Sequence, residues 1–410
     1  MKMIKNHSDI SDDTSKELFA LYSHVNPSTV DPSRECDMAQ RYASQIAESF
    51  GLPRLAFEGR SLLDVGCGSG ANLCAYAFLG AKVTGIDFDE KAISNAGSFL
   101  NRQGLTAEKL LVGSIYDLQN RALEHTYDIV TCSGLLHHLS DPYHGFRNLT
   151  EKVRPGGLLI VRVGSQISAV QHQLMKLAVR YFVNDINDID EVIPVAEALF
   201  DESFKRAVKF GGRSIQQIVS DQIVNNQHYY ILAEDLVRIG HDCGVFLLDQ
   251  FPRTSGFFGD SAINNSIPSG DISSLNHKIS QLYCASHVLP DIALFKNTSQ
   301  VTSAYEAFRK ISSIFNGSSE KFLQAGDKKL DEALYHINES KEQMESFDIG
   351  TRYLNSSIRK FFNEIHDFLI VLRDKDFENV VRFTTSTEVL FRGTCGLHLN
   401  TYMFEKKIIT

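Results

Sequence analysis

The sequence predicts an α/β protein built on a doubly wound, mainly parallel sheet, with a helical insertion in the sheet domain and a helical domain after it. Between residues 61 and 163, short apolar runs alternate with amphipathic helical patterns, which is typical of a parallel sheet with crossover helices. A glycine-rich turn, "GCGSG", joins the first apolar run to the first helix. Residues 165–226, and the chain from about residue 301 onward, show helical spacing instead.

The composition is that of a globular protein and argues against bulk nucleic-acid binding. At 410 residues, of which 43% are hydrophobic, the chain is long enough for two domains or for one decorated domain. The net charge of −9 is moderate and the two signs of charge are mixed, so no broad basic face is available for phosphates. We therefore do not expect a nucleic-acid partner.

The cysteines and the first residues favour a reduced, cytoplasmic protein. The seven cysteines are scattered without a C-x-x-C pair, a pattern that fits neither a disulfide framework nor a zinc site. The stretch "MKMIKNHSDISDDTSKELF" lacks the apolar core of a signal peptide, and no run approaches the roughly 18 apolar residues of a membrane span. We expect a cytoplasmic location, no membrane contact and no bound metal.

The elements follow in order along the chain. Residues 1–60 contain helical patterns, chiefly from Cys36 to Phe50, and most simply pack beside the first strand. Residues 61–300 form the sheet domain, whose first five strands are expected near residues 61–65, 82–86, 109–112, 127–132 and 157–163.

The strand pattern breaks after residue 164 and resumes near residue 229. Residues 165–226 are expected to form a helical insertion after the fifth strand. An amphipathic helix then leads to a sixth strand from Val245 to Phe251, and "DIALFK", Asp291 to Lys296, is the expected seventh. Leucine and phenylalanine stripes over residues 301–410 predict a C-terminal helical domain, whose role the sequence leaves open.

The stretch "LLDVGCGSGANL" has the form of a nucleotide-type cradle. Gly66, Gly68 and Gly70 lie between a buried strand and a helix, where the absence of a Cβ lets a ligand rest on the backbone. No Lys-Ser or Lys-Thr follows, so a triphosphate site is excluded. Asp64 beside the turn suits a cationic amino group, and Asp87, at the end of the next strand, can accept both hydroxyls of a ribose. The expected ligand is a nucleoside that bears an amino acid.

Four ordered motifs, "LLDVGCGSG", "VTGIDFDEKAI", "YDIVTCSGLLHHLSDP" and "VRPGGLLIVRV", resemble those of class I S-adenosylmethionine-dependent methyltransferases. The resemblance covers roughly residues 62 to 163. It implies a seven-stranded Rossmann-like methyltransferase sheet, S-adenosyl-L-methionine as cofactor and S-adenosyl-L-homocysteine as product. In this family the helices before the core often close over the site, so residues 1–60 are expected to form a lid.

The resemblance also implies roles for individual cofactor-binding residues. The three glycines would run along the methionine moiety, Asp64 would bind its amino group, and Asp87 would hold the ribose. Phe88 would pack against adenine, and Ser133 would face the cofactor. Where the family usually has an acidic residue near adenine, this chain has Ser114, so Ser114 and Ile115 are expected as neighbours and Asp117 as a substitute acid.

The acceptor side of the site is less defined by the sequence. His137 and His228 are the candidate catalytic residues, since a neutral imidazole can accept a proton from a hydroxyl or amine. His138 matches a family position that packs against the next helix, whereas His137 is either a surface histidine or a substrate-side group. The insertion is expected to form a substrate cap. The candidate substrate-binding residues, drawn from the lid and the cap, are Tyr22, His24, Arg213 and Tyr229.

The leading functional hypothesis is an enzyme that methylates an O or N atom of a small or medium-sized acceptor, such as a secondary metabolite in a biosynthetic pathway, by in-line displacement. One alternative is a peptide or protein methyltransferase that recognises its substrate through residues 301–410. Another is a cofactor-binding regulatory subunit without turnover. The sequence is also compatible with a homodimer.

Overall fold

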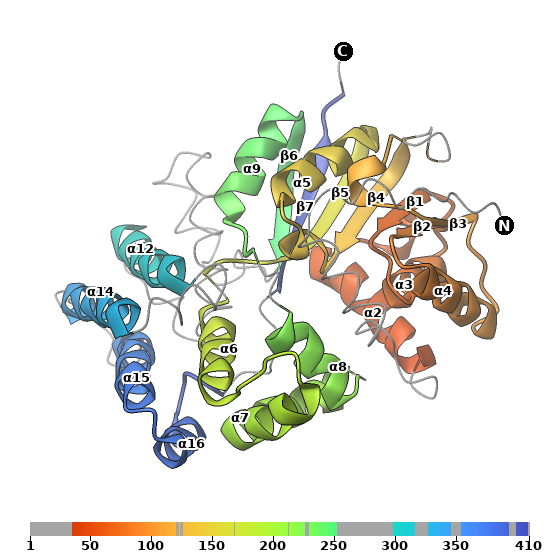
Figure 1. Ribbon diagram of the computed structural model, residues 1–410. Helices are drawn as coiled ribbons and strands as arrows, with labels where there is room; N and C mark the ends of the chain where they lie inside the picture. Colours follow the sequence, from red (N-terminus) through yellow and green to blue (C-terminus); the bar gives the residue numbers. More distant parts are fainter. Residues whose placement is uncertain are drawn as a thin grey trace.

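The computed structural model places seven strands in a single sheet in the order β3-β2-β1-β4-β5-β7-β6 (Figure 1). All neighbours are parallel except β7, which is antiparallel to both β5 and β6. The doubly wound, mainly parallel sheet predicted from the sequence is thereby confirmed. The strands are β1 (Ser61–Val65), β2 (Lys82–Asp87), β3 (Lys109–Val112), β4 (Tyr127–Ser133), β5 (Val153–Gly164), β6 (Val245–Phe251) and β7 (Leu399–Lys406). The structure describes residues 35–119, 123, 126–167, 169–211, 213–225, 229–251, 298–315, 327–345, 354–392 and 399–408.

Helices cover both faces of the sheet (Figure 1), and central strands such as β1 and β2 are accordingly buried on both faces. In β5, Leu159, Val161 and Val163 pack in one core cluster with helices α5 (Pro142–Glu151) and α9 (Ala233–Asp242). Ile160, between them in sequence, packs on the opposite face in a second cluster. The helices of that second cluster are α2 (Glu35–Phe50), α3 (Ala71–Phe78) and α4 (Glu90–Arg102).

The insertion after β5 lies beyond the carboxyl ends of the parallel strands, below the sheet in Figure 1. We call it the cap. It consists of α6 (Val170–Phe182), α7 (Ile189–Gly211), α8 (Ile215–Val219) and a π-helix (Ser220–Val224) that continues α8. This position is the edge of the sheet at which doubly wound proteins bind their ligands.

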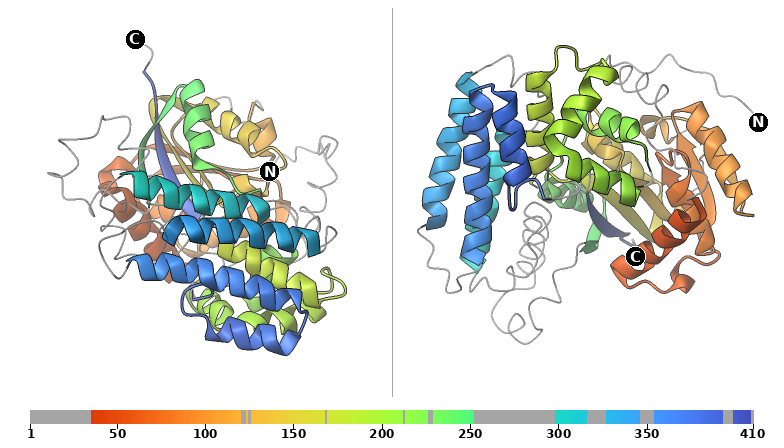
Figure 2. Two further views of the ribbon diagram at one scale, coloured as in Figure 1. Left: turned by 90° about the vertical axis from the view of Figure 1, so that its left-hand side faces the viewer. Right: turned by 90° about the horizontal axis from the view of Figure 1, so that it is seen from below.

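The C-terminal helices lie beside the cap (Figure 2), and the two share one hydrophobic core. In this core, Leu174 and Phe204 of the cap are buried in the same cluster as Phe308 and Phe361 of the C-terminal helices. The cap is therefore supported by helices that begin only at Thr298, well after the cap ends at Val224. The C-terminal helices are α12 (Thr298–Phe315), α14 (Asp327–Glu345), α15 (Leu354–Arg373) and α16 (Phe377–Ser386).

The predicted position of the seventh strand was wrong. The strand at that place in the sheet is β7, from Leu399 to Lys406, whereas Asp291 to Lys296 lie outside the described residues. Residues 301–410 consequently do not form a purely helical unit. The reason is that β7 pairs with β5 and β6 only after the whole helical region has intervened in sequence, so no local pattern links it to them. The remaining domain boundaries stay predictions.

No helix in the described part of the chain combines the length and the apolar character that a membrane crossing requires.

Candidate active site

The glycine turn lies at the carboxyl end of β1 and has left-handed backbone at all three predicted glycines. Gly66, Gly68 and Gly70 have φ angles of 73°, 53° and 89°, which L side chains rarely adopt. A Cβ added to Gly70 would lie 2.8 Å from the Cβ of Ala96, so helix α4 packs directly on the turn. The turn is held to β2 because the Gly66 amide donates to the carbonyl of Ile86 over 2.8 Å.

Asp64 is a buried carboxylate to which no described residue donates a hydrogen bond. It is the fourth residue of β1 and only 1% exposed, yet neither of its two carboxylate oxygens has a partner. Burial, reinforced by the nearby charge of Asp87, raises the pKa of Asp64 to about 7. An unpaired buried carboxylate is costly, and such a group in a native structure is explained most simply by a ligand that completes it.

Asp87 ends β2 and connects the glycine turn to the next loop. Its Oδ2 accepts a hydrogen bond from the Gly68 amide at 2.8 Å, and its Oδ1 accepts one from the Asp89 amide at 3.0 Å. Burial raises its pKa to about 6, although these two donors oppose the rise. Helix α4 is capped by a different residue, because the Asp89 side chain accepts from the Lys91 amide at 2.9 Å. Asp87 is thus not the helix cap.

The residues expected near adenine follow β2 and β3. Phe88 comes directly after Asp87 and is half-buried. The ends of the two strands are adjacent, because the Gly113 amide donates to the Asp87 carbonyl at 2.9 Å. The Ser114 hydroxyl accepts from the Tyr116 amide at 3.1 Å and caps a 3-10 turn, Ile115–Asp117. Ile115 is buried, whereas Asp117 is exposed.

His137 is buried at the carboxyl end of the sheet, on the turn that follows Ser133, the last residue of β4. Its Nδ1 accepts a hydrogen bond from the Gly164 amide at 3.2 Å. Burial, with the charge of His138 next in importance, holds the pKa of His137 well below its usual range. The ring is therefore neutral, and with Nδ1 accepting, its proton lies on Nε2. The interpretation of His137 as a surface histidine is excluded.

His138 and Arg213 both contact the same carboxylate of the cap. Asn225 Nδ2 donates to His138 Nδ1 at 3.2 Å, which directs His138 Nε2 towards Asp221 Oδ1 at 3.9 Å. Arg213 NH1 lies 2.9 Å from Asp221 Oδ2. Asp221 belongs to the π-helix, an irregularity that occurs often at functional sites. Arg213 thus forms an ion pair with Asp221. His138, which follows β4, joins the sheet to the cap through the same carboxylate.

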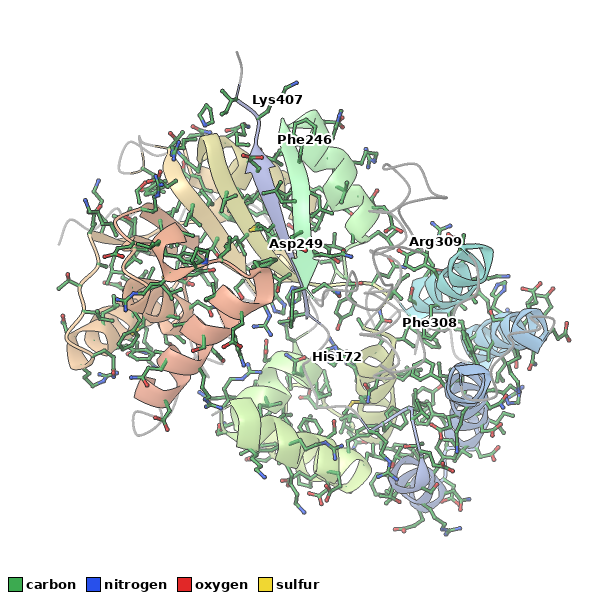
Figure 3. The ribbon with its side chains drawn as sticks, turned by 180° about the vertical axis from the view of Figure 1, so that it is seen from behind. His172, Phe246, Asp249, Phe308, Arg309 and Lys407 are labelled. Atoms are coloured by element: carbon green, nitrogen blue, oxygen red, sulfur yellow. The ribbon has the colours of Figure 1, made fainter. Side chains whose placement is uncertain are left out.

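Tyr230 and His172 form a second link between the sheet and the cap. Figure 3 labels His172, which belongs to α6 of the cap. His172 Nε2 donates to the Gln222 carbonyl at 2.7 Å, so its Nδ1 is the acceptor for the Tyr230 hydroxyl. Burial, with Lys176 adding to the effect, lowers the pKa of His172 to about 4, so this ring is also neutral. The Tyr230 ring packs on β5, where a Cβ added to Gly164 would lie 2.8 Å from it. Tyr229, 39% exposed, contacts the site through its backbone amide, which donates to the His137 carbonyl at 2.8 Å.

Two buried cationic side chains of α6 donate hydrogen bonds to the backbone carbonyls at the end of the π-helix. Arg180 donates to the carbonyls of Ile223 and Val224, and Lys176 donates to that of Asn225. Positive charge at the carboxyl end of a helix is favourable because it opposes the helix dipole. The π-helix is thereby held to α6 within the cap by charge as well as by packing.

The structure brings most of the predicted site residues to one edge of the sheet. Sequence reasoning did not single out His172 and Asp221, although a histidine within the apolar helix "AVQHQLMKLAVRYF" was a usable signal. Tyr22, His24 and His228 lie outside the described residues. Those at the edge are Asp64, Gly66, Gly68, Gly70, Asp87, Phe88, Ser114, Ile115, Ser133 and His137.

A glycine turn beside a buried carboxylate, at the carboxyl edge of a doubly wound sheet, is typical of nucleoside-binding α/β enzymes, and similarity to known proteins gives the family. Residues 63–161 match the family described as "Methyltransferase domain". The mitochondrial ubiquinone biosynthesis O-methyltransferase of Schizosaccharomyces pombe is 31% identical over 211 residues, which are 49% of this chain and 73% of that protein. The chain belongs to the class I S-adenosylmethionine-dependent methyltransferases, and its cofactor is S-adenosylmethionine.

Other relatives match over shorter stretches. The ubiquinone biosynthesis O-methyltransferase of Caulobacter vibrioides is 35% identical over 118 residues, 27% of this chain and 43% of that protein. The chain thus spans less than half of that relative. Among solved structures, magnesium protoporphyrin IX methyltransferase from Synechocystis PCC 6803 with bound S-adenosylmethionine is similar with a TM-score of 0.36 and 14% identity, over 59% of this chain and 91% of that one.

Proposed function

We propose that this enzyme transfers a methyl group to an oxygen atom of a small or medium-sized acceptor by in-line displacement. The observation that carries the proposal is Asp64, a buried carboxylate without a described partner beside a glycine turn. This carboxylate fits a ligand whose amino-acid end carries a cationic amino group. Oxygen is favoured over nitrogen because relatives of this chain are named O-methyltransferases.

The residues present fit S-adenosylmethionine. Asp64 would pair with its ammonium group, and the backbone of Gly66, Gly68 and Gly70 would line its methionine moiety. Asp87 would accept from the ribose hydroxyls, with Phe88, Ser114 and Ile115 around the adenine and Ser133 beside the sulfonium. The Asp87 carboxylate already accepts from Gly68 and Asp89, so its remaining lone pairs would serve the ribose.

The bound cofactor supplies both the methyl group and its leaving group, so the protein chiefly has to align the acceptor and exclude water. His137 cannot serve as a base through Nδ1, because that atom accepts the Gly164 amide hydrogen. We assign it instead as a donor that orients the acceptor oxygen through Nε2–H. A phenolic or enolic acceptor would bind as its oxyanion after releasing its proton to water, so the methyl transfer to that oxygen would need no protein base.

A compact acceptor is favoured because the cap lies over the strand ends. The contacts of Asp221, Asn225 and Tyr230 with the sheet are buried, so an extended peptide would have to displace them. Arg213 and Tyr229, like Tyr22, His24 and His228, stay predicted substrate-side residues. A homodimer and a cytoplasmic location also stay predictions, and the Schizosaccharomyces pombe relative is a mitochondrial protein.

The proposal is tested by incubating the protein with methyl-labelled S-adenosylmethionine and a panel of phenols, each matched with the corresponding aniline. We expect label on phenolic oxygen, with one S-adenosylhomocysteine formed for each methyl transferred. Cofactor binding with transfer only to amines, or only to peptides, would contradict the assignment of an oxygen on a compact acceptor.

Replacing Asp87 is expected to weaken cofactor binding more than it weakens the fold. Asp87→Ala removes the acceptor for the ribose and should lower S-adenosylmethionine affinity roughly ten- to hundredfold, about 1.5–3 kcal/mol. Stability should fall by roughly 1–2 kcal/mol, because the Gly68 and Asp89 amides lose their acceptor. Titration calorimetry and thermal unfolding measure the two effects.

Asp89→Ala is the matched control for this variant. It removes the cap of α4 and should cost about 1 kcal/mol of stability while sparing the affinity for S-adenosylmethionine. If Asp87→Ala behaved like this control, Asp87 would be a structural residue only.

A further inference from the structure

Arg162 is a half-buried cation for which the described part of the chain offers no hydrogen bond or ion pair through its side chain. It is the tenth residue of β5, in the otherwise apolar run "LLIVRVG". Most other arginines near the site are engaged, as Arg180 and Arg213 show. A guanidinium has five donors, and leaving them without acceptors in a half-buried position has a cost.

The side chain of Arg162 lies on the same face of the sheet as Asp64. Strand residues alternate between faces, so Arg162 shares its face with Ile160, two residues before it, which packs in the cluster of α2 and α3. The register pairs Asp64 with Thr131 and Thr131 with Ile160, so these three also lie on one face. Arg162 itself pairs with Ser133 at the carboxyl end of β4.

The charge of Arg162 acts on both sides of the site. It contributes to lowering the pKa of His137, behind burial and the other neighbours of that ring, and it partly offsets the raised pKa of Tyr76. The Tyr76 hydroxyl lies 3.3 Å from Thr131 Oγ1, beside the Asp64 strand. The guanidinium is therefore within electrostatic range of the Asp64 side and of the His137 side.

Arg162 and Asp64 do not neutralise each other. Two strand spacings separate them across the sheet, about 10 Å, and two residues along it, roughly 7 Å. The long arginine side chain covers part of that distance, but no ion pair joins the two groups among the described residues. Within the described part of the chain, one anion and one cation thus stay without a partner at a single edge. This favours either one ligand that carries charges of both signs or two ligands that each carry one of them.

We propose that Arg162 binds a carboxylate of a ligand at the carboxyl ends of β4 and β5. This assignment rests on the proposed function of the site. A planar guanidinium recognises a carboxylate through two parallel hydrogen bonds, which fixes orientation as well as charge. The carboxylate belongs either to the methionine end of the cofactor or to the acceptor, and the two sources are distinguished by experiment.

The cofactor arm compares S-adenosylmethionine with its decarboxylated form by titration calorimetry. If Arg162 binds the methionine carboxylate, Arg162→Gln weakens S-adenosylmethionine roughly ten- to hundredfold and leaves the affinity for the decarboxylated cofactor unchanged. Arg147→Gln, which removes an exposed arginine on α5, is the matched control and should change neither affinity.

The acceptor arm uses benzoate and its neutral isostere benzamide, each titrated into the complex with S-adenosylhomocysteine. If the acceptor supplies the carboxylate, the wild type prefers benzoate roughly tenfold or more, and Arg162→Gln removes this preference. Arg162→Lys keeps the charge without the planar fork, so it should retain part of the preference and serves if Arg162→Gln fails to fold.

The outcomes separate this inference from the proposed function. If the wild type bound neither S-adenosylmethionine nor S-adenosylhomocysteine, the proposed function would fail. If it bound them and Arg162→Gln matched the wild type in both arms, with thermal unfolding unchanged, the assignment of Arg162 would be overturned.

Discussion

Removing residues 399–410 is expected to leave a chain that does not fold. The deleted segment contains β7, which is hydrogen-bonded on both edges, to β5 over Leu158–Gly164 and to β6 over Val245–Phe251. Without it, β5 keeps β4 but loses its neighbour on the other side, and β6 loses the one strand that pairs with it among the described residues. β7 occupies the place between β5 and β6 and sets the register of both, so its loss leaves a gap the width of one strand that the packed helices α5 and α9 would have to shift to close.

The stabilising free energy lost with β7 is comparable with the whole stability of a domain. Tyr402 and Phe404 are fully buried in the cluster of α5 and α9, and Met403 is buried on the opposite face. Burying three such side chains contributes roughly 5–9 kcal/mol, whereas a native protein is stable by about 5–15 kcal/mol. Losing the paired backbone of β7 adds to this, because its neighbours keep buried amides and carbonyls without partners.

A shorter deletion provides the control. Removing residues 408–410 takes away Ile408, which is 61% exposed, and leaves every pair of β7 intact, so stability should change by less than about 1 kcal/mol. Far-ultraviolet circular dichroism, thermal unfolding and the yield of soluble protein compare the two truncations. A chain ending at residue 398 that unfolded cooperatively near the wild-type temperature would show that β7 is dispensable.

This expectation also changes how the acceptor class can be tested. Deleting residues 301–410 would separate a small acceptor from a peptide acceptor only if those residues formed an independent unit. They supply β7 to the sheet and pack in one core with the cap, through residues such as Phe308 and Phe361. Loss of activity after such a deletion would therefore report unfolding. Comparing acceptors on the intact chain, as with the phenol and aniline panel, avoids the problem.

The sequence predicts the sheet well where strand and helix alternate locally. Strands β1 to β5 follow one another with short connections, and each is marked by an apolar run. The same reasoning found β6, because an amphipathic helix precedes it. It failed for β7, since "LNTYMFEK" is short, mixed in polarity and placed in the sheet by partners that lie far from it in sequence.

The cofactor side and the cap side of the site also differ in how far local sequence patterns predict them. The cofactor side is encoded in contiguous motifs, so the sequence alone is enough to predict Asp64, the glycines and Asp87 as its residues, and their binding roles stay predictions. The cap side is assembled from α6, the π-helix and Tyr230, and its contacts depend on a packing arrangement that no single stretch specifies. Arg162 is an intermediate case, since a lone arginine in an apolar strand was visible but its lack of a partner was not.

Asp64→Asn is expected to weaken cofactor binding and to stabilise the chain without cofactor, two effects of opposite sign. The variant removes the charge that would pair with the ammonium group of S-adenosylmethionine. Truncating one partner of a buried charge pair typically costs about 2–4 kcal/mol, or roughly 30- to 1000-fold in affinity. The wild-type affinity should itself fall about tenfold for each pH unit below the Asp64 pKa of about 7, because the carboxylate must release a proton to pair.

The gain in stability follows from the same raised pKa. A carboxyl group whose pKa is higher in the folded than in the unfolded state binds its proton more tightly when folded, so its contribution is fully present below pH 3.8 and is lost as the pH rises to about 7. At pH 8 the buried charge of Asp64 costs roughly 2–4 kcal/mol, which the neutral asparagine amide of the variant does not carry to the same extent. At pH 4 the wild-type group is already protonated, and the two proteins should unfold alike.

The measurement is the difference in unfolding free energy between Asp64→Asn and the wild type, both without cofactor, from pH 4 to pH 8. Taking the difference matters because His137 and His172, whose pKa values are lowered, act in the opposite direction and are common to both proteins. The difference should grow between pH 4 and pH 7 and then level off. Unchanged affinity for S-adenosylmethionine together with a flat difference would mean that Asp64 is neither charged in the folded chain nor part of the cofactor site, and the interpretation of the glycine turn would lose its main support.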